Sequence, residues 1–175
     1  MPRFQTLEDF LEKQRPEDET GQAVLQLCRQ LRTALNKIAT IVACGPLAGD
    51  LAAAQGSNPD GDVQKKLDIV AHDYIIETLR DSPAAWVLSE EHDTAIELDR
   101  TRPLALAIDP LDGSSNIETN ATIGTIFIIL PNTGPDATPE AVILQPGTAQ
   151  LAAGDCFYGA HSELVLSSGS VSERL

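Results

Sequence analysis

The chain has 175 residues, and its 42% hydrophobic content is enough to bury one substantial core, which argues against a disordered protein. Its 12 basic and 26 acidic residues give a formal net charge of -14, which argues against nucleic acid or an anionic membrane as a partner. The three cysteines are widely spaced in apolar surroundings, and no apolar run reaches the roughly 18 residues of a membrane helix, so we expect a cytoplasmic protein with reduced thiols.

Two helices are expected in the first half of the chain. After a short leader, apolar residues recur every three or four positions over residues 20–41, which predicts a long helix that buries one face and ends at Gly45-Pro46. Residues 47–61 are rich in Ala, Gly, Ser, Asn and Asp, and we expect them to form a mobile loop. A second amphipathic helix is predicted over residues 67–75, and it ends at Ser82-Pro83.

Short apolar runs replace the helical pattern in the second half of the chain. Runs without strict alternation are typical of strands that are covered on both faces. The predicted strands, of which the last two form a hairpin, are residues 86–88, 104–108, 123–130, 141–144, 150–153, 155–158 and 163–166. Helices followed by strands indicate an α+β fold built in layers.

Carboxylates follow two of the predicted strands. Glu90 and Glu91 come directly after the first buried run. The second run ends in Asp109, where we expect Pro110 to stop the ladder, and Asp112 follows around a turn. Because Asp109 and Asp112 are three residues apart around this turn, both can point at one place.

A metal site is expected if these two strands are neighbours. Four carboxylates at one edge of a sheet raise one another's pKa and destabilise the fold, and a divalent cation removes this cost. All-oxygen ligation without a nearby His or Cys pair favours Mg²⁺ or Mn²⁺ over zinc, and the Leu111 carbonyl can add one more oxygen. Several carboxylates suit two or more ions, which can activate a water and stabilise a leaving alkoxide.

The residues after Asp112 have the groups that hold a phosphate. Gly113 permits a tight turn, and Gly113-Ser114-Ser115-Asn116 offers backbone N–H groups and hydroxyls without adding charge. An acidic pair on a loop is usually solvated surface, and Asp-Pro-x-Asp-Gly-Ser also suits an ordinary turn. Both motifs stand at the end of an apolar strand, which favours the site over the turn.

These motifs are similar to those of a known enzyme family. Residues 109–117, followed by 123–127, resemble the signature of class I fructose-1,6-bisphosphatases. Residues 88–91 resemble the family's other metal-binding segment, and residues 61–68 resemble the segment that joins its dynamic loop to the next helix. The likeness extends in order over nearly the whole chain.

The resemblance implies a layered αβαβα sugar-phosphatase fold, of which residues 1–175 mainly form the N-terminal helix-on-sheet domain. It implies two or more Mg²⁺ ions, with Mn²⁺ also possible, held by Glu90, Glu91, Asp109, Asp112 and the Leu111 carbonyl. It implies a phosphate-binding set that consists of Asp112, Gly113, Ser114 and Ser115. Asp68, with Glu91, would orient and deprotonate the attacking water, and Asp62 would lie on the dynamic loop that closes over the site.

The implied reaction is hydrolysis of the 1-phosphate of fructose 1,6-bisphosphate to fructose 6-phosphate and phosphate in gluconeogenesis, by a homotetramer. Later family segments supply a further metal-binding Glu and most sugar-binding residues, and none occurs before Leu175. We therefore expect the C-terminal substrate domain to be absent. The alternatives are a sedoheptulose-bisphosphatase, an inositol-phosphatase-like enzyme, and a truncated noncatalytic metal-binding domain.

Overall fold

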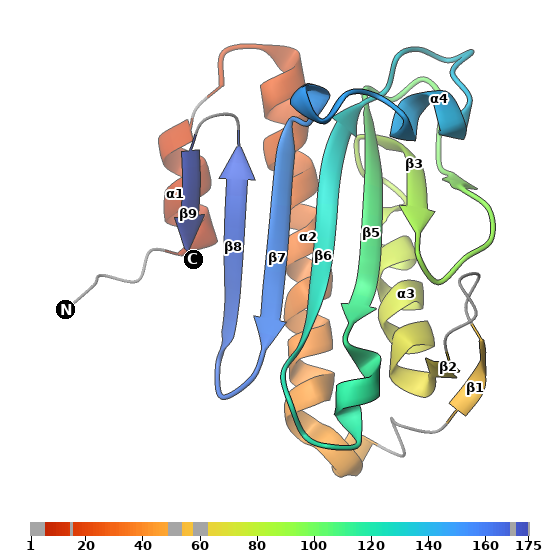
Figure 1. Ribbon diagram of the computed structural model, residues 1–175. Helices are drawn as coiled ribbons and strands as arrows, with labels where there is room; N and C mark the ends of the chain where they lie inside the picture. The colour runs from red at the N-terminus through yellow and green to blue at the C-terminus, as the bar shows by residue number, and fades with distance from the viewer. Residues whose placement is uncertain (1–5, 15, 49–53, 58–62, 169–170, 175) are drawn as a thin grey trace.

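The computed structural model describes residues 6–14, 16–48, 54–57, 63–168 and 171–174. In these residues a helical layer packs against one face of a large sheet, as Figure 1 shows. This arrangement confirms the α+β fold class and the helix-on-sheet domain. None of the helices in the described ranges is both long enough and apolar enough to cross a membrane.

The two predicted helices are confirmed as α2 and α3. The described helices are α1 (Leu7–Gln14), α2 (Glu19–Cys44), α3 (Lys66–Leu79) and α4 (Pro139–Ile143), with 3-10 turns η1 (Gly45–Ala48), η2 (Ser114–Ile117) and η3 (Gly147–Ala149). The Asp18 carboxylate caps α2 by accepting a hydrogen bond of 2.7 Å from the Gly21 N–H. Gly45 ends the helix with a φ of 50°, as the Gly-Pro pair predicted.

A mixed sheet of seven strands makes up the second layer in the described part of the chain, in the order β4-β3-β5-β6-β7-β8-β9. Only β3 and β5 are parallel, and the other neighbours in this sheet are antiparallel. A separate antiparallel pair consists of β1 and β2. The strands are β1 (Ala54–Ser57), β2 (Val63–Lys65), β3 (Ala84–Ser89), β4 (Ile96–Glu97), β5 (Leu104–Asp112), β6 (Ile123–Pro131), β7 (Ala152–Tyr158), β8 (Ser162–Ser168) and β9 (Val171–Arg174).

Several predicted elements differ from the structure. The strand predicted at 141–144 is wrong, because Thr138 accepts a hydrogen bond from the Ala141 N–H and starts helix α4. The strands predicted at 150–153 and 155–158 are one strand, β7. Residues 54–57 of the predicted mobile loop pair with β2 as strand β1. Residues 49–53 and 58–61 of that loop lie outside the described ranges.

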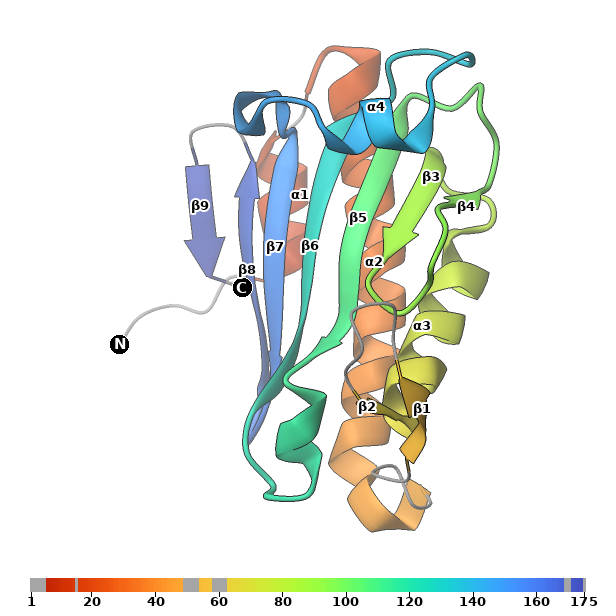
Figure 2. The same cartoon turned by 45° about the vertical axis from the view of Figure 1, so that its right-hand side comes forward.

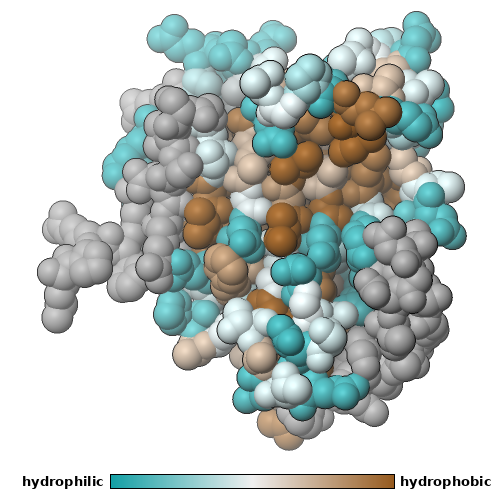
Figure 3. Space-filling view, in the orientation of Figure 1, coloured by the Kyte–Doolittle hydropathy of each residue, from teal (hydrophilic) through white to brown (hydrophobic). Residues whose placement is uncertain are grey.

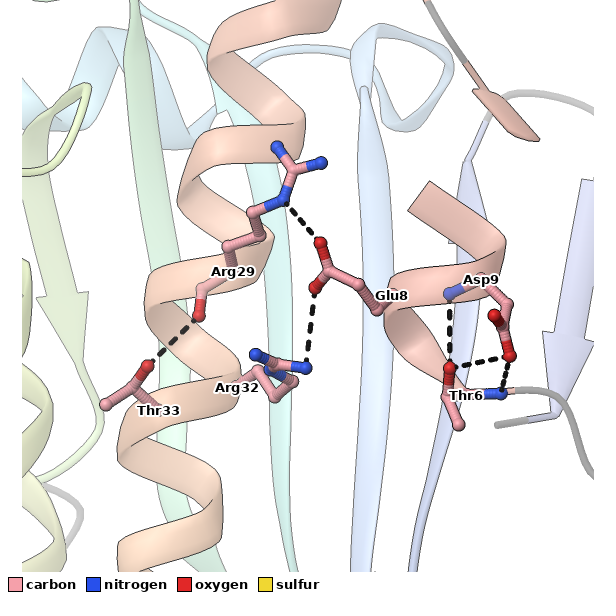
Figure 4. A network of polar contacts seen from close by, with 6 residues as sticks. All are labelled: Thr6, Glu8, Asp9, Arg29, Arg32 and Thr33. Carbon is pink, nitrogen blue, oxygen red and sulfur yellow. Dashed lines mark hydrogen bonds and ion pairs between the residues drawn. The ribbon is translucent and has the colours of Figure 1, made fainter. Parts of the chain in front are cut away.

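Helix α1 lies in the segment that was expected to be a short leader. Thr6 and Asp9 cap it reciprocally: the Thr6 hydroxyl accepts from the Asp9 N–H at 3.1 Å and donates to the Asp9 carboxylate at 2.8 Å. Glu8 on α1 pairs with Arg29 at 3.3 Å and Arg32 at 3.4 Å on α2 (Figure 4). Because exposed ion pairs stabilise little, the buried apolar side of α1 holds the helix in place.

The two faces of the sheet differ in what covers them. Helices α1, α2 and α3 cover one face and bury the main apolar core against it (Figures 1 and 2). On the opposite face, α4 covers only one end, over a small cluster that includes Trp86 and Val142. There Ile126 and Phe157 are 42% and 40% exposed. Figure 3 shows this open face, with apolar residues over the upper part of the strands and polar residues towards their lower ends.

Replacement of Gly154 by Ala tests how tightly the helix-covered face is packed. Gly154 lies opposite Phe127, and an added Cβ would be 2.3 Å from the ring. We expect Gly154→Ala to lower the free energy of unfolding by about 1 to 3 kcal/mol, measured by urea denaturation. The control is Gly147→Ala, because no atom lies within 4 Å of the added Cβ there and a change below about 0.5 kcal/mol is expected. Equal effects of both variants would contradict the packing described.

Candidate metal centre

The parallel pairing of β3 and β5 brings the two acidic segments together. Ser89 is in register with Ile108, so the carboxyl ends of both strands meet at one edge of the sheet. The Glu90 N–H donates to the Ile108 carbonyl at 3.0 Å, which ties the turn after β3 to the residue before Asp109. Glu90 and Asp109 therefore lie side by side, although 18 residues separate them in the sequence.

Three carboxylates converge at this edge. One oxygen from each of Glu90, Glu91 and Asp109 lies within 4.8 Å of the others, and all three side chains are half-buried. This geometry can hold a metal ion, and carboxylate oxygens are ligands that hard divalent cations prefer. Asp112 is not a member of this set, but its charge acts on Asp109.

The electrostatics of the cluster favour a cation. The pKa of Asp109 is raised to about 6, chiefly by burial and further by the charges of Glu90 and Asp112. The Leu111 N–H donates to Asp109 Oδ1 at 2.9 Å and acts in the opposite direction on this pKa. A divalent cation offsets the repulsion among these groups and favours the ionised form of Asp109.

A bulge in β5 turns two carboxylates to the same face of the sheet. Asp109 is paired with Ile126 and Asp112 with Gly124, so three steps along β5 match two steps along β6. In a regular strand, residues three apart point to opposite faces. The extra residue removes this difference, and both carboxylates lie on the face opposite the helical core. The prediction that Pro110 stops the ladder is wrong, because β5 continues to Asp112 through the bulge.

The segment expected to hold phosphate leaves β5 in a tight turn. Gly113 has a φ of 78°, a left-handed conformation that favours glycine, and its carbonyl accepts from the Asn116 N–H at 2.8 Å. Ser114 is half-buried and Ser115 is exposed at the start of η2. The Leu111 side chain is buried in the core, so only its backbone is available at the site.

Asp68 is buried in the first turn of α3, with 1% of its surface exposed. His72 lies one turn later on the same side of the helix and bonds to Ser89 Oγ at 2.9 Å. The side of α3 that carries Asp68 therefore meets the end of β3, and Figure 1 shows the start of α3 at the end of the sheet where β3 and β5 end. Asp62, expected on the dynamic loop, lies outside the described residues.

The sequence did not reveal where His72 and Asp155 lie relative to the acidic cluster. Ser89 Oγ accepts from the Glu91 N–H at 3.3 Å, so the Ser89–His72 contact supports the turn that carries the acidic pair. Asp155 on β7 lies opposite Ile126, in the same row as Asp109. Burial raises the pKa of Asp155, and so does the charge of Asp112. Side-chain alternation in β7 is visible in the sequence, but its register against β6 is not.

Asp109→Asn tests the electrostatic cost of the acidic cluster under metal-free conditions. A raised pKa means that the folded chain retains a proton which the unfolded chain releases between the ordinary value of 3.8 and about 6. The stability contributed by Asp109 is therefore full below pH 3.8 and is lost as the pH rises through about 6. In EDTA at pH 7.5, we expect Asp109→Asn to be more stable by about 1 to 2 kcal/mol, after allowance for solvent screening.

Urea denaturation from pH 4 to pH 8 measures this difference. We expect the variant's advantage to vanish near pH 4, where both side chains are neutral, and Mg²⁺ to stabilise the parent chain more than the variant. A variant that is less stable than the parent at pH 7.5 without metal would contradict this account.

Known proteins resemble this chain over nearly all of its length. Residues 5–174 match the family described as Fructose-1-6-bisphosphatase, N-terminal domain. Fructose-1,6-bisphosphatase class 1 1 of Xanthobacter autotrophicus is 44% identical over 166 residues, which cover 94% of this chain and 45% of the relative. The class 1 enzyme of Azorhizobium caulinodans is 45% identical over 169 residues, which cover 94% of this chain and 51% of the relative.

Solved structures share the fold. The holo form of Leishmania major fructose-1,6-bisphosphatase matches with a TM-score of 0.84 and 28% identity, over 99% of this chain and 55% of that chain. Its T-state matches with a TM-score of 0.78 and 27% identity, over 99% and 53%. This chain spans about half the length of the curated relatives it matches. The resemblance seen in the motifs is confirmed: the chain belongs to the fructose-1,6-bisphosphatase N-terminal domain family.

Proposed function

We propose that this chain carries the metal-binding half of a Mg²⁺-dependent fructose-1,6-bisphosphatase. The reaction is hydrolysis of the 1-phosphate of fructose 1,6-bisphosphate to fructose 6-phosphate and inorganic phosphate. The observation that carries the proposal is the convergence of Glu90, Glu91 and Asp109 beside the turn at Gly113, in a chain whose relatives are named for this activity.

The residues present suit a hard divalent cation. Their donors are oxygens, they are half-buried, and the pKa of Asp109 is raised by burial first and then by the negative charges of Glu90 and Asp112. Glu90, Glu91, Asp109, Asp112 and the Leu111 carbonyl would hold the ions, with Mg²⁺ favoured and Mn²⁺ as a substitute. When bound, the ions supply charge neutralisation and acidify a coordinated water.

The proposed reaction also needs groups that activate the water and hold the phosphate. Asp68 and Glu91 would orient the attacking water, and its proton would pass to Asp68, a buried carboxylate that acts as the general base. The backbone N–H groups and hydroxyls of Gly113, Ser114 and Ser115 hold the oxygens of the phosphate that is cleaved, together with Asp112. Asp62 would lie on the dynamic loop that closes over the site.

The sugar is proposed to bind with the help of additional polypeptide. The relatives are about twice as long as the matched region, and this chain exposes Ile126 and Phe157 on the open face of its sheet. We infer that a segment equivalent to the second half of the relatives covers this face and completes the substrate pocket. Assembly as a homotetramer and a cytoplasmic location are part of the same proposal.

A chimera tests the proposed activity. Residues 1–174 are joined to the second half of the Azorhizobium caulinodans relative, and phosphate release from fructose 1,6-bisphosphate is measured with Mg²⁺ and with EDTA. We expect Mg²⁺-dependent release, and a loss of about 100-fold or more in kcat for Asp68→Asn, because a general base contributes on that scale. Asp73→Asn, an exposed position on the same helix, serves as the matched control and should leave kcat unchanged.

The same assay distinguishes the alternatives. Sedoheptulose 1,7-bisphosphate and inositol monophosphate are offered in parallel, and faster release from either would replace the proposed substrate. A chimera that folds and binds Mn²⁺ but releases no phosphate from any of the three substrates would contradict the enzymatic proposal.

A further inference from the structure

We propose that Thr125 and Tyr158 are positioning residues for the acidic site, because they fix the bulge that turns Asp109 and Asp112 to the same face. The metal-binding part of this inference rests on the proposed function. The geometric part concerns only the shape of β5 and stands on its own.

A short chain of buried hydrogen bonds connects β7 to the bulge. The Thr125 hydroxyl donates to the Pro110 carbonyl at 2.8 Å, and Thr125 Oγ1 lies 2.7 Å from the Tyr158 hydroxyl. Because the single proton of Thr125 is used on a carbonyl, which can only accept, the Tyr158 hydroxyl must donate to Thr125. The order of donation is therefore Tyr158 to Thr125 to Pro110.

Burial makes this chain of hydrogen bonds energetically important. Thr125 is 0% exposed and Tyr158 is 2% exposed, so neither hydroxyl can exchange its partner for water without disturbing the core. Pro110 has no N–H of its own, and it stands between the two carboxylates in the irregular part of the ladder. Loss of the Thr125 donor would leave a buried carbonyl without this partner, and the bulge would lose an anchor.

The register explains why the anchor affects the site. Thr125 lies on β6 between Gly124 and Ile126, which are the partners of Asp112 and Asp109. It therefore holds the bulge from the core side, while both carboxylates lie on the open side. A shift in the bulge would change how the carboxylates of Asp109 and Asp112 are oriented relative to each other. Loss of a group that orients a metal ligand typically lowers metal affinity by about 10- to 100-fold.

Two substitutions at position 125 separate shape from hydrogen bonding. Thr125→Val keeps the shape and removes the hydroxyl, whereas Thr125→Ser keeps the hydroxyl and removes a methyl group. Hydrogen exchange of the Leu111 amide, which donates to Asp109, is measured in EDTA with the Leu106 amide of central β5 as control. Calorimetry with Mn²⁺ measures the affinity of the same full chains.

We expect Thr125→Val to speed Leu111 exchange relative to Leu106 and to weaken Mn²⁺ binding by about 10-fold or more. Thr125→Ser should stay within about threefold of the parent in both measurements, even where it lowers the unfolding temperature. Tyr158→Phe removes the outer donor and the contact of its hydroxyl with Cys156 but leaves the Thr125–Pro110 hydrogen bond in place. It should give a smaller change in the same direction, which keeps the test decisive if the Val variant does not fold.

Two results would overturn the inference: Thr125→Val leaving Leu111 exchange and Mn²⁺ affinity at parental values, or Thr125→Ser losing as much as Thr125→Val. A parent chain that binds no Mn²⁺ would refute the metal site and the metal-binding part of the inference. The exchange measurement would still decide whether Thr125 fixes the bulge, so the two failures are distinguishable.

Discussion

Repulsion among half-buried carboxylates is the constraint on which the rest of this structure depends. Glu90, Glu91 and Asp109 bring oxygens within 4.8 Å of one another, and burial and neighbouring charge raise the pKa of Asp109 to about 6. Such an arrangement opposes folding unless a cation occupies it. A fold that tolerates this cost must hold the three side chains firmly, and here several backbone and side-chain hydrogen bonds do so.

The architecture places the main core on one face of the sheet and the carboxylates of strand β5 on the other. Helices α1, α2 and α3 bury the main core on one face, and this burial supplies most of the folding free energy. Asp109, Asp112 and the exposed apolar residues share the other face. Buried groups on the helical face support the site from behind, as the Thr125 contact with Pro110 illustrates. The free energy gained by apolar burial on the helical face thus offsets the repulsion among the carboxylates of the site.

The sequence alone predicts the two long helices and the residue types of the site better than it predicts the geometry of the site. Apolar periodicity found α2 and α3, and the acidic ends of two apolar runs marked Glu90, Glu91 and Asp109. Helix α1 was missed although Thr6 and its capping partner Asp9 are visible in the sequence. Its 8 residues are too few for the apolar spacing to repeat often enough to indicate a helix. The parallel pairing, the bulge and the position of Asp155 depend on register between distant segments, which no local pattern specifies.

Membership of the family follows from the match over residues 5–174, whereas the reaction depends on whether the acidic cluster holds an ion. Anomalous diffraction from crystals of the chain soaked in Mn²⁺ measures this directly. We expect an anomalous peak among the carboxylate oxygens of Glu90, Glu91 and Asp109, at metal–oxygen distances of about 2 Å. A fully soaked crystal with no peak there, or with peaks only at other surface carboxylates, would contradict it.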